Sequence, residues 1–411
     1  MIELQEALQI VLRSARRLGT ERVELQAALG RILAEDVAAD MDMPPFDKAT
    51  VDGYACRRSD LGNKLTVVET IPAGAVPVKA VGPNQCAKIM TGAAIPRGAD
   101  CVMMIEQTET GGKEAIRFTG GHTPDNIFRK ATDIKAGQVV LRTGSRVNPQ
   151  RVAVLASIGC VQPLAAKRPR VAVIASGDEL VGPDAKPGLS RIRNSNGPQL
   201  VAQLAALGLT AQDYGIVKDV AEDIDAVLKA ALADDDVVII SGGVSVGDFD
   251  LVPDMLRENG VKLLFEKVAV KPGKPTVFGL VERAYVVSQA SRPRCKGETP
   301  SPRAYCFGLP GNPVSTFATF ELLVKPFLCK LMGHDYSPTY VQMRLDESIS
   351  RKDTDRQSWI PVRITSEETV KPVEYHGSAH ILALCEADGL IAMDIGVAGM
   401  EQGTPVRVRL L

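Results

Sequence analysis

The middle of the chain alternates short apolar runs with longer stretches of helical periodicity. The apolar runs at 171–175 and 237–240 are typical of buried strands, and a further strand is expected near Tyr214–Val217. Apolar residues recur every three or four positions at 197–208 and at Glu222–Leu232, which predicts two amphipathic helices. Buried strands that alternate with amphipathic helices predict a mostly parallel sheet with helices on both faces.

The regions on either side follow other patterns. Residues 2–18 have helical spacing with Gly19 as a stop, and a second short helix is expected at 25–33. From Lys64 to Arg142, β-type runs separated by Gly and Pro predict a small β-rich module: LTVVETI, CAKIM, CVMMIE, AIRF and QVVLR. From about Ser337, the runs VRI, ILAL, LIAM and VRVRL predict a final β domain.

Three local signals refine this outline. Asn148-Pro149 is typical of a helix cap followed by proline at the first helical position. Residues 165–169 are interpreted as a linker. Pro326 should kink the final turns of the helix that GLPGNPVS opens, because proline lacks a backbone N–H.

Composition excludes several classes of protein. The 411 residues are 45% hydrophobic and 24% charged, as in ordinary globular proteins of several domains. The net charge of −1 provides no field to attract nucleic acid or an anionic membrane, and no apolar run reaches membrane-spanning length. The eight cysteines form no CxxC motif and the N-terminus is acidic, which favours a cytoplasmic protein with reduced thiols.

The strongest chemical signal is the stretch 237–250, VVIISGGVSVGDFD. Glycine lets backbone N–H groups converge on an anion, and the serines add hydroxyl donors. The carboxylates Asp248 and Asp250 at the end of the stretch could hold a cation against the same anion. The pattern predicts a phosphate-bearing ligand with a divalent metal, although a plain strand-to-helix turn fits this loop alone equally well.

Other polar groups follow the neighbouring predicted strands. Residues 177–179, Asp219 and 241–250 should lie along one sheet edge, where open α/β sheets bind ligands. Lys271 and Lys274, in KPGKP, are expected near this edge. Asn312 is expected to cap a helix that has Pro313 in its first turn. The N-terminus of this helix offers a second anion site.

Weaker candidates leave alternatives open. Asp47 and Asp52 flank a short loop and are either metal ligands or, more simply, turn caps. Thr91, Gly92 and Asp100 either present donors to a ligand or form a turn between strands. His376 and His380 are interpreted as structural, because Gly377 and a β context argue against a helical metal pair.

Seven motifs in register cover nearly the whole chain: FDKATVDGYACR, KIMTGAAIPRGAD, SGDEL, SGGVSVGDFD, KPGKP, GLPGNPVS and GSAHILAL. Together they resemble the MoeA family of molybdopterin molybdenumtransferases, which includes the E domain of gephyrin. The resemblance implies a multidomain α/β and β fold. It consists of an elongated helical domain I (1–41 and 137–167), a β-rich inserted domain II (42–136), a MogA-like α/β domain III that binds molybdopterin (168–331) and a C-terminal β-barrel, domain IV (332–411).

The resemblance also implies an activity, the last step of molybdenum cofactor synthesis. Adenylylated molybdopterin and molybdate react in the presence of Mg²⁺ and yield molybdenum cofactor and AMP. The family is a homodimer whose active cleft lies between domain III of one subunit and domain II of the other. A MogA-type adenylyltransferase is the implied upstream partner.

Residue roles carry over motif by motif. The implied catalytic residues are Asp52, Thr91, Asp133, Glu179, Asp219 and Asp250, and Mg²⁺ ligands are expected among them at Asp219, Asp250 and Asp52. The implied substrate-binding residues are Gly177, Asp178, Ser241, Gly242, Gly243, Ser245, Gly247, Lys271, Lys274, Pro310, Gly311, Asn312, Pro313 and Ser315.

The chain departs from the family pattern in two places. Ala131-Thr132 stands where the family usually has Gly-Glu before the aspartate that is Asp133 here, and the stretch 289–303 is longer than the usual hairpin. Two other functions stay open: a non-catalytic molybdopterin-binding scaffold, as gephyrin's second role suggests, and a MogA-like adenylyltransferase. The latter does not explain residues 42–136 or the C-terminal domain. The choice between molybdate and tungstate and the position of the oxyanion site are also open.

Overall fold

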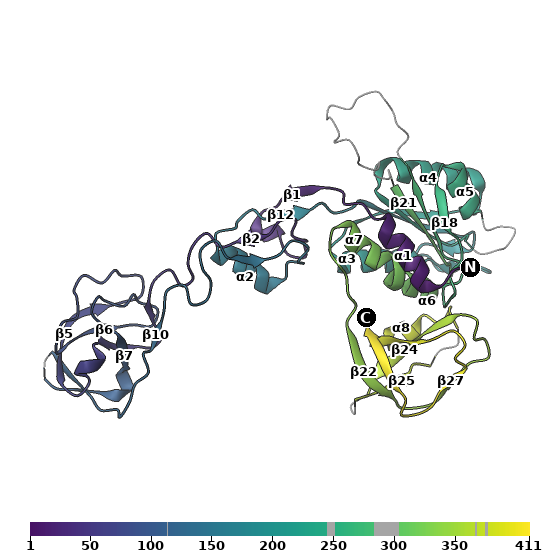
Figure 1. The fold of residues 1–411 in the computed structure, drawn as a ribbon. Helices are drawn as coiled ribbons and strands as arrows, with labels where there is room; N and C mark the ends of the chain where they lie inside the picture. The colour runs from purple at the N-terminus through teal and green to yellow at the C-terminus, as the bar shows by residue number, and fades with distance from the viewer. Residues whose placement is uncertain (113, 245–250, 283–303, 366–367, 375–376) are drawn as a thin grey trace, which may run out of the picture. The chain divides into compact units, whose positions relative to one another are not determined.

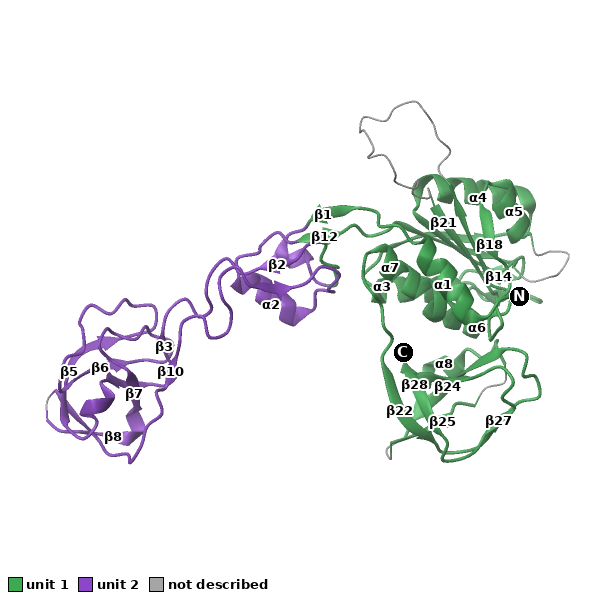
Figure 2. Ribbon diagram, viewed as in Figure 1, with its two compact units in different colours: residues 1–22, 30–34, 164–411 green, residues 23–29, 35–163 purple. Residues whose placement is uncertain are grey.

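The computed structural model describes residues 1–112, 114–244, 251–282, 304–365, 368–374 and 377–411. The chain folds into two compact units, which Figure 2 colours separately. Unit 1 contains residues 1–22, 30–34 and 164–411, and unit 2 contains residues 23–29 and 35–163. The predicted residues 245, 247, 248 and 250, together with His376 and the whole stretch 289–303, lie outside the described residues.

Unit 1 is built on a six-stranded sheet. Its strands lie in the order β16 (Ala211–Val217), β13 (Val171–Ser176), β17 (Val237–Ser241), β21 (Ala304–Leu309), β20 (Val277–Val281) and β18 (Lys262–Phe265). The first four strands are mutually parallel, and β20 runs antiparallel to both of its neighbours. The predicted mostly parallel sheet is therefore confirmed.

Helices cover both faces of this sheet (Figure 1). On β13, Val171 and Val173 pack with helices α1 (Leu4–Ser14), α3 (Asn196–Ala206) and α7 (Lys325–Leu331). The alternate residues Ala172 and Ile174 pack with α4 (Ala221–Asp234) and α5 (Val252–Glu258). A strand with apolar residues at every position is explained by burial on both faces.

The helix that GLPGNPVS opens is distorted just before Pro326 and not in its final turns, where the kink was expected. It begins as α6 (Pro313–Thr319), widens into the π-helical turn η4 (Phe320–Val324) and continues as α7. Pro326 has no N–H with which to continue the ladder of hydrogen bonds, so the preceding turn departs from α geometry.

The C-terminal part of unit 1 is a closed β-barrel of five strands. They are β22 (Tyr340–Leu345), β24 (Gln357–Ile364), β25 (Thr369–Pro372), β26 (Gly389–Met393) and β28 (Pro405–Leu410). Closure follows from β24, which pairs with both β25 and β26. The prediction of a β-type run at ILAL is wrong, since α8 (Leu382–Cys385) forms there with only Ala383 buried. An apolar run of four residues is too short to distinguish strand from helix by pattern.

Short strand pairs complete unit 1. They are β1 (Thr20–Arg22) with β12 (Leu164–Ala166), β14 (Leu180–Val181) with β15 (Ile192–Arg193), β19 (Val270–Lys271) with β24, and β23 (Ile349–Ser350) with β27 (Gly399–Met400). The interpretation of 165–169 as a linker is wrong at its start, because residues 164–166 pair with β1.

Unit 2 contains the predicted β-rich module. Its six-stranded sheet has the order β7 (Cys101–Met104), β4 (Gly53–Cys56), β6 (Gln85–Ile89), β5 (Lys64–Ile71), β9 (Ala115–Phe118) and β8 (Thr108–Thr110). The run QVVLR forms β11 (Val139–Leu141), which pairs with β2 (Val37–Ala38) and not with this sheet. A third pair joins β3 (Lys48–Ala49) to β10 (Ile127–Phe128).

Helical segments in unit 2 are short. Helix α2 (Pro149–Ser157) has the predicted cap, because the Asn148 side chain accepts a hydrogen bond from the Arg151 N–H at 2.9 Å. The 3₁₀ turns are η1 (Leu25–Ala27), η2 (Arg58–Asp60) and η3 (Ile105–Gln107).

Two N-terminal helix predictions need correction. The helix expected at 25–33 is only the turn η1, since Gly30 has φ +77°, a left-handed conformation that ends helical geometry. Helix α1 ends at Ser14 and not at Gly19. Just after its end, the Arg16 N–H donates to the Tyr305 hydroxyl. No helix within the described ranges is long and apolar enough to cross a membrane.

Candidate active site

The predicted ligand-binding residues of unit 1 follow strands that end at the same sheet edge. The register pairs Ser176 with Val217, Ala175 with Ser241, and Ser241 with Leu309. Parallel strands place their carboxyl ends together, so the segments that follow β13, β16, β17 and β21 gather at this edge.

The turn after β17 depends on glycine. Gly242 has φ +102°, and its N–H donates to the Leu309 carbonyl at 3.1 Å. A Cβ added at Gly242 would lie 2.1 Å from the Ser176 carbonyl oxygen. The turn therefore passes against the end of β13 at a distance that no other residue permits.

Acidic residues lie beside this turn. The half-buried Asp219 accepts a hydrogen bond from the Ser176 hydroxyl, and its N–H donates to the Asp178 carboxylate at 3.4 Å. The Glu179 carboxylate bends back over Gly177, with Oε2 2.7 Å from the place a Cβ would take there. The structure thus brings together 177–179, Asp219 and 241–243, as the sequence predicts.

Asn196, which the sequence reasoning missed, joins two of these segments. Its Nδ2 donates to the Ser241 hydroxyl at 2.8 Å and to the Gly311 carbonyl at 2.6 Å. The Ser241 hydroxyl in turn donates to the Pro310 carbonyl at 3.0 Å. The available signal was an asparagine at a predicted helix start, which indicates a cap, but Asn194 accepts the capping bond from the Gly197 N–H at 3.0 Å.

The helix start after β21 is partly engaged by the barrel segment. Asn312 occupies the N-cap position, but the prediction that its side chain caps the helix is wrong. Its Nδ2 donates to the Ser378 hydroxyl at 2.8 Å, while the Val314 N–H donates to the Ser378 carbonyl at 3.1 Å. Pro313 has no N–H, and Ser315 is only 3% exposed.

The two predicted lysines occupy different places. Lys274 is exposed and lies three residues before Val277, which pairs with Gly308 near the carboxyl end of β21. Its backbone therefore leads into the end of β20 that lies beside the carboxyl end of β21. Lys271 is exposed in β19 and pairs with Ser358 of the barrel strand β24.

The donor chemistry at this edge suits magnesium better than a transition metal. The described residues contain no group of three or more His, Cys, Asp or Glu side chains placed to hold a metal. Mg²⁺ normally takes only one or two carboxylates and completes its shell with water and substrate phosphates. Asp219 is a carboxylate that could take this role, and the Ser176 hydroxyl that donates to it fixes its orientation.

In unit 2, the register of β4 and β6 brings Asp52 to Thr91. Gly53 pairs with Ile89, and both the Thr91 N–H and its hydroxyl donate to Asp52 Oδ1, at 2.6 and 2.7 Å. The Thr91 hydroxyl, and after it the backbone N–H, holds the pKa of Asp52 below its ordinary value. An exposed, ionised carboxylate is thus fixed at this end of the sheet.

The segment that carries Asp133 is attached to residues 43–47. The Asp133 N–H donates to the Met43 carbonyl at 3.0 Å, and Asp47 accepts from the Lys130 N–H at 2.8 Å and the Arg129 side chain at 3.0 Å. None of the hydrogen bonds within the described chain joins Asp133 to Asp52. The turn forms even though Ala131 stands where the family usually has glycine, and Ala131 itself adopts φ +60°.

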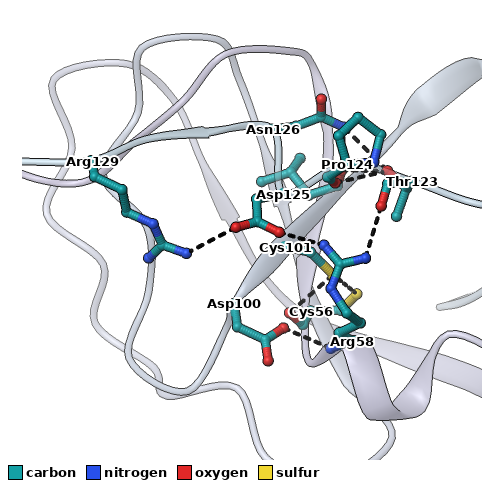
Figure 3. A network of polar contacts seen from close by, with 10 residues as sticks. Cys56, Arg58, Asp100, Cys101, Thr123, Pro124, Asp125, Asn126 and Arg129 are labelled. Carbon is teal, nitrogen blue, oxygen red and sulfur yellow. Dashed lines mark hydrogen bonds and ion pairs between the residues drawn. The ribbon is translucent and has the colours of Figure 1, made fainter. Parts of the chain in front are cut away.

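A chain of polar contacts continues from Arg129 (Figure 3). Arg129 reaches Asp125 at 3.5 Å, and the other carboxylate oxygen of Asp125 accepts from Arg58 at 2.6 Å. Arg58 also donates to the Thr123 carbonyl at 2.8 Å, and its backbone N–H donates to Asp100 at 2.6 Å. Asp100 therefore accepts from the start of η2, and its role in the turn between β6 and β7 stays a prediction.

A cavity of about 1170 Å³ lies elsewhere in unit 1, between α1, α7 and the barrel. Leu8, Trp359 and Arg409 are among its lining residues, and none of the predicted site residues is. The candidate site is therefore the open sheet edge and not this cavity.

Comparison with known proteins agrees with this geometry. Three family models match in succession: "MoeA N-terminal region (domain I and II)" at residues 2–159, "Probable molybdopterin binding domain" at 172–330 and "MoeA C-terminal region (domain IV)" at 343–411. The molybdopterin molybdenumtransferases of Staphylococcus epidermidis RP62A and Staphylococcus aureus COL are each 35% identical over 423 residues, covering 100% of this chain and 95% of the relative.

A solved structure confirms the fold. The molybdopterin biosynthesis moeA protein of Pyrococcus horikoshii OT3 is 28% identical and superposes with a TM-score of 0.82, covering 100% of both chains. A second structure of the Pyrococcus horikoshii protein is 29% identical with a TM-score of 0.79. Sequence motifs, sheet topology, barrel and relatives therefore agree that this chain belongs to the MoeA family.

Proposed function

We propose that the chain is a molybdopterin molybdenumtransferase, which converts adenylylated molybdopterin and molybdate into molybdenum cofactor and AMP. One observation carries the proposal: the glycine turn at Gly242, the carboxylates Glu179 and Asp219 and the turn at Gly311 converge on one sheet edge. The curated relatives that match the whole chain bear this activity in their names.

The edge suits a ligand with phosphate groups. Adenylylated molybdopterin carries a terminal phosphate and a pyrophosphate, and molybdate is a dianion, so the reaction brings negative groups together. The Gly242 N–H is used on the Leu309 carbonyl, so in this turn it is the Gly243 N–H that would bind a phosphate oxygen, and the exposed Lys274 would add a positive charge. These groups bind and position the phosphates before reaction.

The carboxylates complete the proposed machinery. Asp219 and Asp250, with Asp52, would hold Mg²⁺, which when bound polarises the scissile pyrophosphate. The Ser176 hydroxyl donates to Asp219 and fixes its orientation. Glu179 positions the metal or the attacking oxygen. Thr91 keeps Asp52 ionised and directed by its two hydrogen bonds.

We further propose that the enzyme acts as a homodimer in the cytoplasm, as the family resemblance implies. In the dimer, Asp52, Thr91 and Asp133 of one chain act with Glu179, Asp219 and Asp250 of the other. The substrate is already adenylylated, so a MogA-type adenylyltransferase must supply it.

AMP release tests the proposal. We expect the purified chain to release AMP from adenylylated molybdopterin only when Mg²⁺ and molybdate are both present. Asp219→Asn should abolish this release while Asp213→Asn, an exposed change within β16, should retain it. A parallel assay with tungstate determines the oxyanion preference.

Two outcomes would overturn the proposal. Binding of the pterin without AMP release at any oxyanion concentration would indicate a scaffold. Adenylylation of molybdopterin from ATP by this chain would indicate an adenylyltransferase.

A further inference from the structure

Asn196 is a buried polar residue whose side-chain orientation is determined by its partners. It is 9% exposed at the start of α3. The Gly311 carbonyl is an acceptor only, so the group that faces it at 2.6 Å must be the amide nitrogen. The Ser241 hydroxyl uses its proton on the Pro310 carbonyl, so it accepts from the same Nδ2.

These contacts use both amide protons and leave the amide oxygen without a partner. Asn196 Oδ1 is buried, and no hydrogen bond reaches it within the described part of the chain. A buried acceptor without a partner destabilises the folded state. An asparagine at this position is therefore costly for stability, which indicates a role for its two donated bonds.

The donated bonds join the two turns of the candidate site. One turn follows β17 (241–243), and the other follows β21 (310–312). The Gly242 N–H to Leu309 carbonyl bond links the strand ends, and Asn196 links the turns beyond them from a third element, α3.

We propose that Asn196 is a positioning residue that holds these two turns at the spacing needed to bind the phosphate groups of the substrate. The inference rests on the proposed function. In this role Asn196 makes no contact with the reacting atoms and acts through Ser241 and Gly311. Loss of its amide donors should let the turns separate and weaken binding of adenylylated molybdopterin by roughly tenfold, as loss of supporting hydrogen bonds does at other preorganised sites.

Asn194 provides a matched control. It is 7% exposed, lies two residues earlier, and accepts the capping bond of α3 from Gly197. Asn194→Ala therefore removes a buried asparagine hydrogen bond from the same helix start but leaves both turns linked. A merely structural effect of Asn196 should be reproduced by this control.

The experiment measures the dissociation constant of adenylylated molybdopterin by calorimetry for the full chain, with the midpoint of thermal unfolding recorded alongside. We expect Asn196→Ala to raise the dissociation constant about tenfold and Asn194→Ala to change it less than about twofold, although both lower the unfolding midpoint. Asn196→Asp, nearly isosteric, should bind poorly at neutral pH and improve as pH falls, because the protonated carboxyl regains one donor. If Asn196→Ala does not fold, Asn196→Ser replaces it in the same comparison.

The outcomes separate this inference from the proposed function. Wild-type affinity in Asn196→Ala, or equal losses in both asparagine variants, would overturn the positioning role. Tight binding by the wild type without AMP release would overturn the transferase but leave the positioning role testable by affinity. No binding by the wild type would overturn both.

Discussion

Ala131 adopts a conformation that alanine resists. Its φ of +60° places its backbone in the left-handed region, where the Cβ is crowded. Its N–H donates to the Pro44 carbonyl at 3.0 Å. The left-handed region costs roughly 1 kcal/mol for a residue with a Cβ. We expect Ala131→Gly to raise the free energy of unfolding of unit 2 by about 1 kcal/mol, measured by urea denaturation.

Ala136 serves as the comparison, since it lies in the same region of unit 2 and is not among the residues with positive φ. Ala136→Gly should be neutral or destabilising, because glycine adds freedom to the unfolded chain without relieving strain. Equal effects of the two substitutions would contradict the interpretation of strain at Ala131.

Gly242 can be tested against a glycine that has a similar backbone but open surroundings. Gly215 has φ +76° with no atom within 4 Å of an added Cβ, whereas at Gly242 the Ser176 carbonyl oxygen lies at 2.1 Å. Gly215→Ala should lower the free energy of unfolding by about 1 kcal/mol. Gly242→Ala should lower it by about 1–3 kcal/mol more and should also remove most of the AMP-releasing activity. Chemical denaturation and AMP release measure the two effects, and a Gly242→Ala protein as stable as Gly215→Ala would argue against the close approach.

At the scale of elements, Glu69 organises the loop that follows β5. Its carboxylate accepts hydrogen bonds from the N–H groups of Val78, at 3.0 Å, and Lys79, at 2.9 Å. The Lys79 N–H, followed by that of Val78, lowers the pKa of Glu69 below its ordinary value. The stabilisation is therefore complete above the pKa of the unfolded chain and is lost as pH falls through the lower folded value.

We expect the amide NMR shifts of Val78 and Lys79 to titrate together at a pH below the ordinary glutamate pKa. Glu69→Gln should abolish this titration, and Glu109→Gln, an exposed change in β8, should not. A transition that persists in Glu69→Gln would show that another group controls the loop.

Hydrophobic periodicity alone was sufficient to predict the secondary structure where an element is long or buried on both faces. The strands β13 and β17 and the helices α3 and α4 were predicted from periodicity because tertiary packing agrees with local preference there. It failed for ILAL, where the run is short, and at 25–33, where Gly30 breaks a plausible helix. The five-stranded closure of the barrel depends on pairing between distant strands, which periodicity does not encode.

The candidate site was predictable to the extent that it follows strand ends. Parallel topology places Glu179, Asp219 and Gly242 at one edge, so motif positions were enough. The sequence did not reveal Asn196, because its side chain contacts the backbone of Gly311, which is 115 residues away in the sequence. The engagement of Asn312 by Ser378 was missed for the same reason.

At the scale of the whole molecule, the proposed catalytic residues divide between the two units: Asp52, Thr91 and Asp133 belong to unit 2, and Glu179 and Asp219 belong to unit 1. We propose that both sets serve one reaction, and that in the homodimer they come from different chains. Chains that are inactive for different reasons should then complement one another.

The most direct measurement is AMP release, with molybdate and Mg²⁺ present, by a mixture of Asp52→Asn and Asp219→Asn chains that have been allowed to exchange subunits. Each variant alone should be inactive. The mixture should recover roughly a quarter of wild-type activity, because half of the dimers are mixed and each mixed dimer has one intact set of residues. A mixture that exchanges subunits and stays inactive would contradict the shared site.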